Sequence, residues 1–171
     1  GPEFYPSRSD PVPQPRTAKD VVADLHAALV ACDVPGPYVL VGHSLGGLCQ
    51  RLYASTYPDD VAGLVLVDAT SEHTYPEFKA ALGPELWEVF DAMQTDTTAL
   101  REAYPDAEIL ATAPEDEAET YTQMIEAQER SPLRPMPLVV LSHGIPFPKP
   151  FPEWPTEKME AIMLDLQARE A

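Results

Sequence analysis

Residues 38–57 read YVLVGHSLGGLCQRLYASTY, and this stretch decides the expected fold. Tyr38–Val41 is a short apolar run, which is typical of a strand buried on both faces of a sheet. Residues 42–47 combine glycines with one serine and predict a tight turn, whereas Leu48–Tyr57 has the spacing of a helix. A strand, a tight turn and a helix therefore follow one another around Ser44.

The same alternation continues on either side of this stretch. Thr17 predicts the start of a helix that runs to about Cys32, and Thr156–Ala168 predicts another. Val61–Val67 and Leu138–Leu141 are two further apolar strands. Alternating buried strands and helices predict the α/β class, a parallel sheet with helices on both faces. Ligands of such folds bind at the edge where the strands end.

The segment Ala69–Pro135 contains no clear strand pattern. Pro84–Met93 and Ala118–Arg130 have apolar residues at helical spacing. The segment also holds 15 Asp and Glu residues against 4 Lys and Arg residues, a net charge of −11. We therefore expect a helical insertion with a strongly solvated, acidic surface.

Composition excludes several classes of function. The net charge of −17 argues against binding to nucleic acid or to an anionic membrane surface. No apolar run reaches the ~18 residues of a membrane span. The two cysteines, Cys32 and Cys49, lack metal or redox spacing and favour a reducing, cytoplasmic location. Gly1–Phe4 has the sequence of a cloning remnant, so the first residues carry no targeting information.

The turn at Ser44 has the features that a nucleophilic serine requires. A sharp turn between strand and helix would project the Ser44 Oγ from the edge of the sheet, with strain in its backbone. Gly42 and Gly46 would lie close together there, where side chains would clash. The backbone N–H of Leu45 opens the helix, where it can stabilise negative charge that develops on a carbonyl oxygen.

These segments resemble the centre of a bacterial α/β-hydrolase. The resemblance is carried by Val39–Gly47, Arg51–Ala54 and Val61–Ala69, and less specifically by Leu138–Gly144. Ser9–Thr17 is similar to the segment after the family's fourth strand. The resemblance implies that the three strands are the fifth, sixth and seventh of the family and that Ser44 is the nucleophile.

The resemblance also implies a division of the chain. After the remnant at 1–4, residues 5–68 would form the first part of the core, 69–135 a helical cap and 136–171 the second part of the core. The family's first strands, with the loop that supplies a second oxyanion donor, have no counterpart here, nor has its eighth strand. The chain therefore looks like the middle of a larger enzyme.

A serine nucleophile needs a base and an acid that orients the base. In the family the catalytic histidine follows the eighth strand, so we expect it beyond the C-terminus. Of the four histidines present, His26, His43 and His73 are expected to be incidental or structural. His143, which ends the third strand, remains a weak candidate.

Two carboxylates are candidates for the acid. Asp68 ends the second strand at the active edge, and a structural role in capping the following turn is the alternative. Many relatives place the acid after the seventh strand, where this chain has no carboxylate before Glu153, so Glu153 is the second choice.

The expected reaction is hydrolysis of a small-molecule carboxylic ester through an acyl-enzyme at Ser44. A thioesterase, amidase, acyltransferase or cofactor-free haloperoxidase activity at the same serine is the first alternative, and a non-catalytic fragment or pseudoenzyme is the second. No metal-ligand spacing, phosphate loop or dinucleotide motif is present, so no cofactor and no metal are expected. The two outer strands would leave open sheet edges, which predicts self-association or a partner chain.

Overall fold

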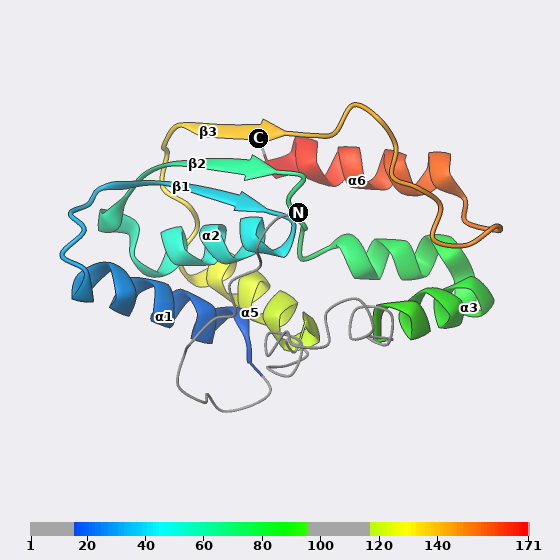
Figure 1. The fold of residues 1–171 in the computed structure, drawn as a ribbon, viewed down its shortest axis with the longest axis horizontal. Helices are drawn as coiled ribbons and strands as arrows, with labels where there is room; N and C mark the ends of the chain where they lie inside the picture. Colours follow the sequence, from blue (N-terminus) through cyan, green and yellow to red (C-terminus); the bar gives the residue numbers. More distant parts are fainter. Residues whose placement is uncertain (1–15, 96–116, 171) are drawn as a thin grey trace, which may run out of the picture.

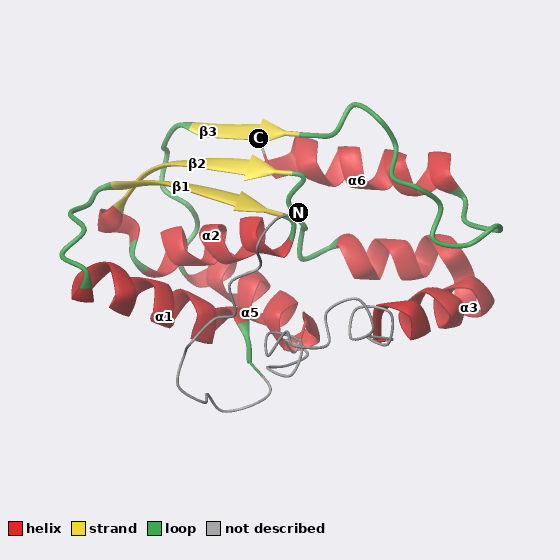
Figure 2. Ribbon diagram, viewed as in Figure 1, coloured by secondary structure: helices red, strands yellow, loops and turns green. Residues whose placement is uncertain are grey.

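The computed structural model describes residues 16–95 and 117–170 (Figure 1). Three parallel strands alternate with helices along the chain (Figure 2). The elements are α1 (Ala18–Ala31), β1 (Tyr38–His43), α2 (Leu45–Thr56), the 3₁₀ turn η1 (Pro58–Asp60), β2 (Val61–Val67), α3 (Thr74–Thr95), α5 (Glu117–Arg130), β3 (Leu138–Leu141) and α6 (Thr156–Glu170). The sequence-based predictions that concern 1–15 and 96–116 lie outside the described residues.

The strands form one sheet in the order β1-β2-β3, with both pairs parallel. Their register places His43 opposite Val67 and Val67 opposite Leu141, so all three strands end at one edge. The predicted α/β class with a parallel sheet is therefore confirmed. Within the described residues β1 and β3 are the outer strands of the sheet.

Two boundaries next to Ser44 differ from the prediction. β1 continues to His43, and α2 begins at Leu45, three residues before the predicted start. The glycines at 46 and 47 lower helix propensity, but packing against the sheet outweighs that cost, since Gly47 and Leu48 are buried. Only Ser44 separates the strand from the helix.

The core lies between the sheet and the helices packed on one side of it. α2 contacts β1 and β2, while α1 and α5 pack against α2. The largest apolar residues of this core are Leu40, Leu48, Leu52, Tyr53, Leu64 and Met124. Because Met124 comes from α5, part of the predicted cap region packs into the core. The assignment of 69–135 as a separate cap stays a prediction.

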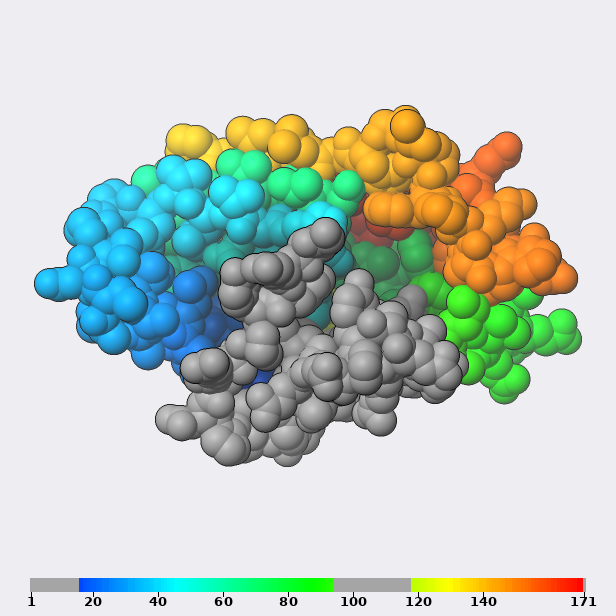
Figure 3. All heavy atoms as spheres, in the orientation of Figure 1, coloured from blue at the N-terminus to red at the C-terminus, as the bar shows by residue number. Residues whose placement is uncertain are grey.

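No described helix lies on the other face of the sheet, which corrects the predictions of helices on both faces and of strands buried on both faces. Val39 and Val41 are 64% and 63% exposed, and Val139 and Leu141 are 47% and 50% exposed. Side chains around β3 are visible along the upper edge in Figure 3. The described helices pack on one face of the sheet only. The apolar strands, which predicted burial on both faces, are therefore buried on that face and exposed on the other.

A second apolar cluster joins α3 to α6 beside the main core. Phe78 and Phe90 of α3 surround Trp154, which precedes α6, with ring centroids 6.0 and 5.2 Å from it. Gly83 adopts φ 73° and kinks α3 just before Pro84. None of the described helices combines the length and apolar character needed to cross a membrane.

Candidate active site

Ser44 occupies the sharp turn between β1 and α2. Its φ of 52° and ψ of −130° lie outside the regions that non-glycine residues favour. Its N–H donates to the carbonyl of Val67 at 3.1 Å, and its carbonyl accepts from the N–H groups of Gly47 at 2.9 Å and Thr70 at 3.0 Å. The predicted strain in the Ser44 backbone is confirmed by its positive φ, and hydrogen bonds to β2 and to the loop after it hold the residue.

The glycines around Ser44 have different roles. A Cβ atom at Gly42 would lie 2.5 Å from the carbonyl oxygen of Gly46, so the backbone approach requires glycine there. A Cβ at Gly47 would lie 2.4 Å from the Cβ of Ala69. At Gly46 an added Cβ meets nothing within 4 Å, so the expected clash at that position is wrong. The close contact involves the backbone of Gly46 and not the space around its own Cα.

Asp68 follows β2 at the same edge. Its φ is 42°, and its N–H donates to the carbonyl of Leu141 at 2.8 Å. The N–H of Ser44 bonds in the same way to Val67, the residue before Asp68. Backbone hydrogen bonds thus connect the end of β1 to the end of β2 and the end of β2 to the end of β3. The two residues with positive φ, Ser44 and Asp68, directly follow the neighbouring strands β1 and β2. The sequence-based placement of Asp68 at this edge is correct.

His143 lies between two carboxylates. Its backbone N–H and its ring Nδ1 both lie 2.7 Å from Oδ1 of Asp68. Its Nε2 lies 2.5 Å from Oε2 of Glu160, which comes from α6. The ring is partly buried and packs on Phe147 at a centroid distance of 4.4 Å. Ends of β2 and β3 are thereby linked to α6.

These contacts shift the pKa values of both partners. Glu160 first, and then Asp68, accept hydrogen bonds from the imidazolium and raise the pKa of His143 above its usual 6.5. Partial burial raises the pKa of Asp68, but hydrogen bonds from the backbone and ring of His143 outweigh it and leave the pKa below its usual 3.8. Both shifts favour the charged forms of the two partners.

The remaining acid candidate and histidines lie elsewhere. Glu153 is exposed in the loop before α6. His26 of α1 stacks on Tyr57 at 3.9 Å and lies 3.1 Å from the hydroxyl of Tyr53, toward the far end of α2. His43 is exposed and lies on the open face of the sheet, as the alternation along β1 shows. His73 is exposed in the loop after β2.

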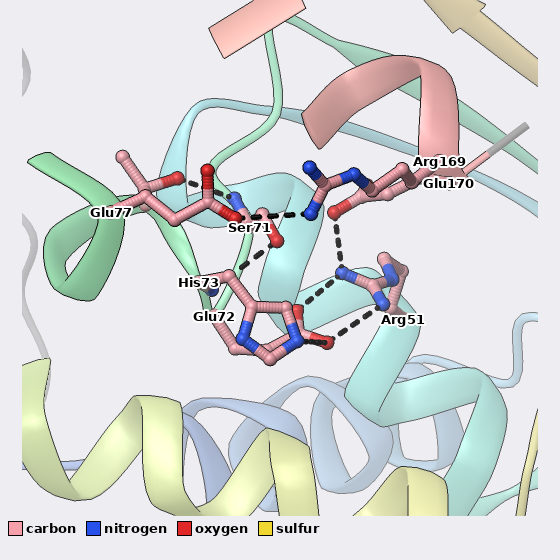
Figure 4. A network of polar contacts seen from close by, with 8 residues as sticks. Arg51, Ser71, Glu72, His73, Glu77, Arg169 and Glu170 are labelled. Atoms are coloured by element: carbon pink, nitrogen blue, oxygen red, sulfur yellow. Dashed lines mark hydrogen bonds and ion pairs between the residues drawn. The ribbon is translucent and has the colours of Figure 1, made fainter. Parts of the chain in front are cut away.

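A second ionic network lies under this edge (Figure 4). Arg51 of α2 is buried and bonds Glu72 at 2.8 Å and Glu170 of α6 at 2.7 Å through the same Nη1 atom. Glu72 belongs to the loop whose Thr70 bonds Ser44. Burial raises the pKa of Glu170 to about 7. Burial also raises the pKa of Glu72, but hydrogen bonding and attraction from Arg51 outweigh it and lower that pKa.

Sequence reasoning missed Glu160, Arg51, Glu72 and Glu170. Each lies on a helix or loop where a charged residue is expected at the surface, and no local pattern distinguishes it from its charged neighbours. The described residues contain no group of three or more His, Cys, Asp or Glu side chains arranged to hold a metal ion. This edge brings together a strained serine, a backbone N–H at a helix start and a hydrogen-bonded carboxylate.

Comparisons with known proteins identify the family. A sequence profile of the alpha/beta hydrolase family matches residues 4–165. An uncharacterized protein of Schizosaccharomyces pombe is 41% identical over 66 residues, 39% of this chain and 12% of that protein. The probable transporter efuK of Hormonema carpetanum is 33% identical over 75 residues, 43% of this chain and 11% of that protein.

A solved structure gives a weaker match over a longer stretch. It is a probable hydrolytic enzyme of Pseudomonas aeruginosa, with 20% identity and a TM-score of 0.48. The match covers 93% of this chain and 61% of that enzyme. The chain thus spans about an eighth or less of the two curated relatives, at 12% and 11%, and less than two thirds of the solved enzyme.

Proposed function

Because the chain belongs to the alpha/beta hydrolase family, we propose that it is the nucleophile-bearing part of a serine hydrolase that cleaves small carboxylic esters. The conformation of Ser44 is the observation that carries this proposal. A serine with φ of 52° sits between a parallel strand and a helix start, and backbone hydrogen bonds hold it there. That strain has a functional purpose if it presents Oγ to a substrate.

The proposed reaction proceeds through an acyl-enzyme. The Ser44 Oγ attacks the ester carbonyl, and the N–H of Leu45 at the start of α2 stabilises the oxyanion that forms. The alcohol leaves, and water then releases the acid from Ser44. Asp68, at the adjacent strand end, orients the base that accepts the Ser44 proton. Glu153 is the less suitable acid, because it is exposed in the loop before α6.

We propose that this chain does not supply the base of the triad. All four histidines are described. Both ring nitrogens of His143 face carboxylates, so neither is available to accept a proton. His26 is bonded near the far end of α2, ~12 Å along the helix from Leu45 at its usual rise per residue. We propose that the base comes from a polypeptide segment outside this chain.

The same observation favours one alternative for the chain by itself. If neither His43, on the open face of the sheet, nor His73, in the loop after β2, serves as the base, the isolated 171 residues would be a non-catalytic fragment of the same fold. Thioesterase, amidase or acyltransferase activity would use the same serine and differ in the substrate, which the described residues around Ser44 do not distinguish.

The open sheet supports a proposal about partners. The outer strands β1 and β3 and the exposed valines of one face leave apolar surface uncovered in the described part of the chain. We propose that self-association or a partner chain covers this surface.

A fluorophosphonate probe tests the nucleophile directly. We expect Ser44 to be labelled more readily in a longer protein that supplies the base than in this chain, and the Ser44→Ala variant of either to lose the label. Ser142→Ala is the matched control, since Ser142 is an exposed serine at the same edge of the sheet. Equal labelling of wild type and Ser44→Ala would overturn the proposed nucleophile. Labelling that appears only in a longer protein would support the proposal that the base lies outside this chain.

A further inference from the structure

We infer that His143 is a positioning residue for Asp68 and that Glu160 holds it in place. The inference rests on the proposed function, in which Asp68 is the acid. It assigns a role to His143, in the loop after β3, and to Glu160, on α6. The proposed reaction does not otherwise use these two side chains.

Both ring nitrogens of His143 contact carboxylate oxygens. Carboxylates accept hydrogen bonds and cannot donate them when ionised. Nδ1 lies 2.7 Å from Asp68 and Nε2 lies 2.5 Å from Glu160, so both nitrogens must carry a proton to satisfy these contacts. The ring is therefore an imidazolium between two carboxylates. Such charge-assisted bonds are shorter and stronger than neutral ones.

His143 holds one carboxylate oxygen of Asp68 through two hydrogen bonds. The backbone N–H and Nδ1–H of His143 converge on the same oxygen, Oδ1, at 2.7 Å each. Two donors from one residue hold this oxygen in place, and a side-chain hydrogen bond with Gln167 of α6 also acts on the carboxylate. The positive φ of Asp68 places its side chain at this point in the first place. His143 thus orients the acid without touching the reacting atoms.

Glu160 holds the other side of the histidine ring. Its Oε2 binds Nε2 of His143, and its Oε1 accepts from the N–H of Phe147 at 3.2 Å. Phe147 also packs on the histidine ring. The groups that face the ring are therefore Asp68 from the loop after β2, Phe147 from its own loop and Glu160 from α6. Without the Glu160 charge the ring would lose half of the negative charge that keeps it protonated.

An NMR titration of the 171-residue chain tests this arrangement. We expect the ring of His143 to titrate above 6.5, the usual pKa of a histidine. In Glu160→Gln, which keeps an acceptor of the same shape, His143 should titrate at lower pH and the carboxyl carbon of Asp68 at higher pH than in wild type. Glu157→Gln, an exposed neutralisation on the same helix, should move neither group.

A second variant keeps the test decisive if the first perturbs α6. His143→Gln removes the imidazolium and keeps the backbone N–H, so Asp68 should again titrate at higher pH. If Asp68 titrates as in wild type in both variants, with amide spectra that show a retained fold, the inference is overturned. A His143 ring that titrates at or below 6.5 would overturn it as well.

The labelling rate of Ser44 adds a functional readout. In a longer protein that supplies the base, a misplaced acid should slow reaction with the fluorophosphonate roughly tenfold to a hundredfold in Glu160→Gln, with Glu157→Gln at the wild-type rate. If Ser44 is labelled at the wild-type rate while Asp68 has shifted its titration, the positioning role alone fails. If Ser44→Ala is labelled like wild type, the proposed function fails, and the Asp68 titration still decides whether His143 orients that carboxylate.

Discussion

A Cβ atom added at Gly42 would lie 2.5 Å from the carbonyl oxygen of Gly46, which is backbone and cannot rotate away. Gly42→Ala should therefore destabilise the fold by about 1–3 kcal/mol, the usual range for overpacking. Gly46→Ala is the matched control, because a Cβ there meets nothing within 4 Å and alanine favours the helix. Urea denaturation of both variants measures the difference. Equal midpoints for the two would show that the turn relaxes more freely than its geometry indicates.

The ion pair of Asp68 and His143 predicts a window of pH stability. The pKa of Asp68 is lowered from 3.8, so its contribution is present above pH 3.8 and is lost as the pH falls through the lowered value. The pKa of His143 is raised from 6.5, so its contribution is complete below pH 6.5 and is lost as the pH rises through the raised value. Urea midpoints measured from acid to alkaline pH should show both limbs, and His143→Gln should flatten the alkaline limb. An unchanged alkaline limb would contradict this origin.

Single residues were predictable where local geometry leaves a signature in the sequence. The spacing of Gly42, Ser44 and Gly46 predicts the strained turn, because few residue types fit such a backbone. Glu160 left no signature, because its contact with His143 joins residues 17 positions apart that chain direction alone does not bring together. A histidine directly after a strand was the one available signal for this cluster.

Among the elements, α2, α6 and the loop after β2 meet at Arg51. Folded Glu170 has a pKa of about 7, above its usual 4.5, because burial disfavours the charge. Below pH 4.5 this residue adds no penalty, and stability should fall as the pH rises from 4.5 to about 7. In Glu170→Gln, which keeps an acceptor for Arg51, that fall should disappear. The effect separates from that of His143, which acts above pH 6.5.

Thermal or urea unfolding at pH 4.5 and pH 8 gives the measurement for Glu170. Glu170→Gln should match wild type at the lower pH and exceed it at the higher pH. Glu157→Gln serves as control, because Glu157 lies exposed in the first turn of the same helix. A loss of stability in Glu170→Gln at pH 8 would show that attraction to Arg51 outweighs the cost of burying the charge.

Strands and helices were predicted better than their surroundings. Val61–Val67 and Leu138–Leu141 match β2 and β3, because runs of branched apolar residues specify a strand locally. The same runs gave the wrong expectation of burial on both faces, since Val39 and Val41 are exposed. A sequence pattern reports which surfaces need a partner, and it does not report whether the described chain supplies that partner.

At the scale of the whole molecule, the proposed nucleophile and acid have no base supplied by this chain in the proposed function. We therefore expect turnover of simple esters to be poor or absent for the isolated 171 residues. A missing oxyanion donor alone lowers the rate roughly 10²–10³-fold, and a missing base lowers it further. Hydrolysis of a chromogenic ester, compared between wild type and Ser44→Ala, is the measurement. Turnover within about tenfold of ordinary esterases, of order 10 per second, and lost in Ser44→Ala, would show that a histidine of this chain serves as base.

The open sheet predicts the behaviour of the chain in solution. Val39 and Val41 are 64% and 63% exposed on outer strand β1, and Val139 and Leu141 extend the same apolar face to β3. Such a surface, with unpaired strand edges, favours association with another chain. Light scattering should therefore give a mass above the 18.8 kDa of one chain at micromolar concentration.

Charge and a single substitution make this prediction specific. The net charge of −17 repels a second copy, so added salt should promote association by screening that repulsion. Val41→Lys places a charge on the open face without entering the core, and it should restore the mass of one chain. Val30→Lys is the matched control, because Val30 is also 64% exposed but lies on α1. If wild type stays monomeric at every salt concentration, the open face is compatible with a single chain in water, and neither self-association nor a partner is required to explain its stability.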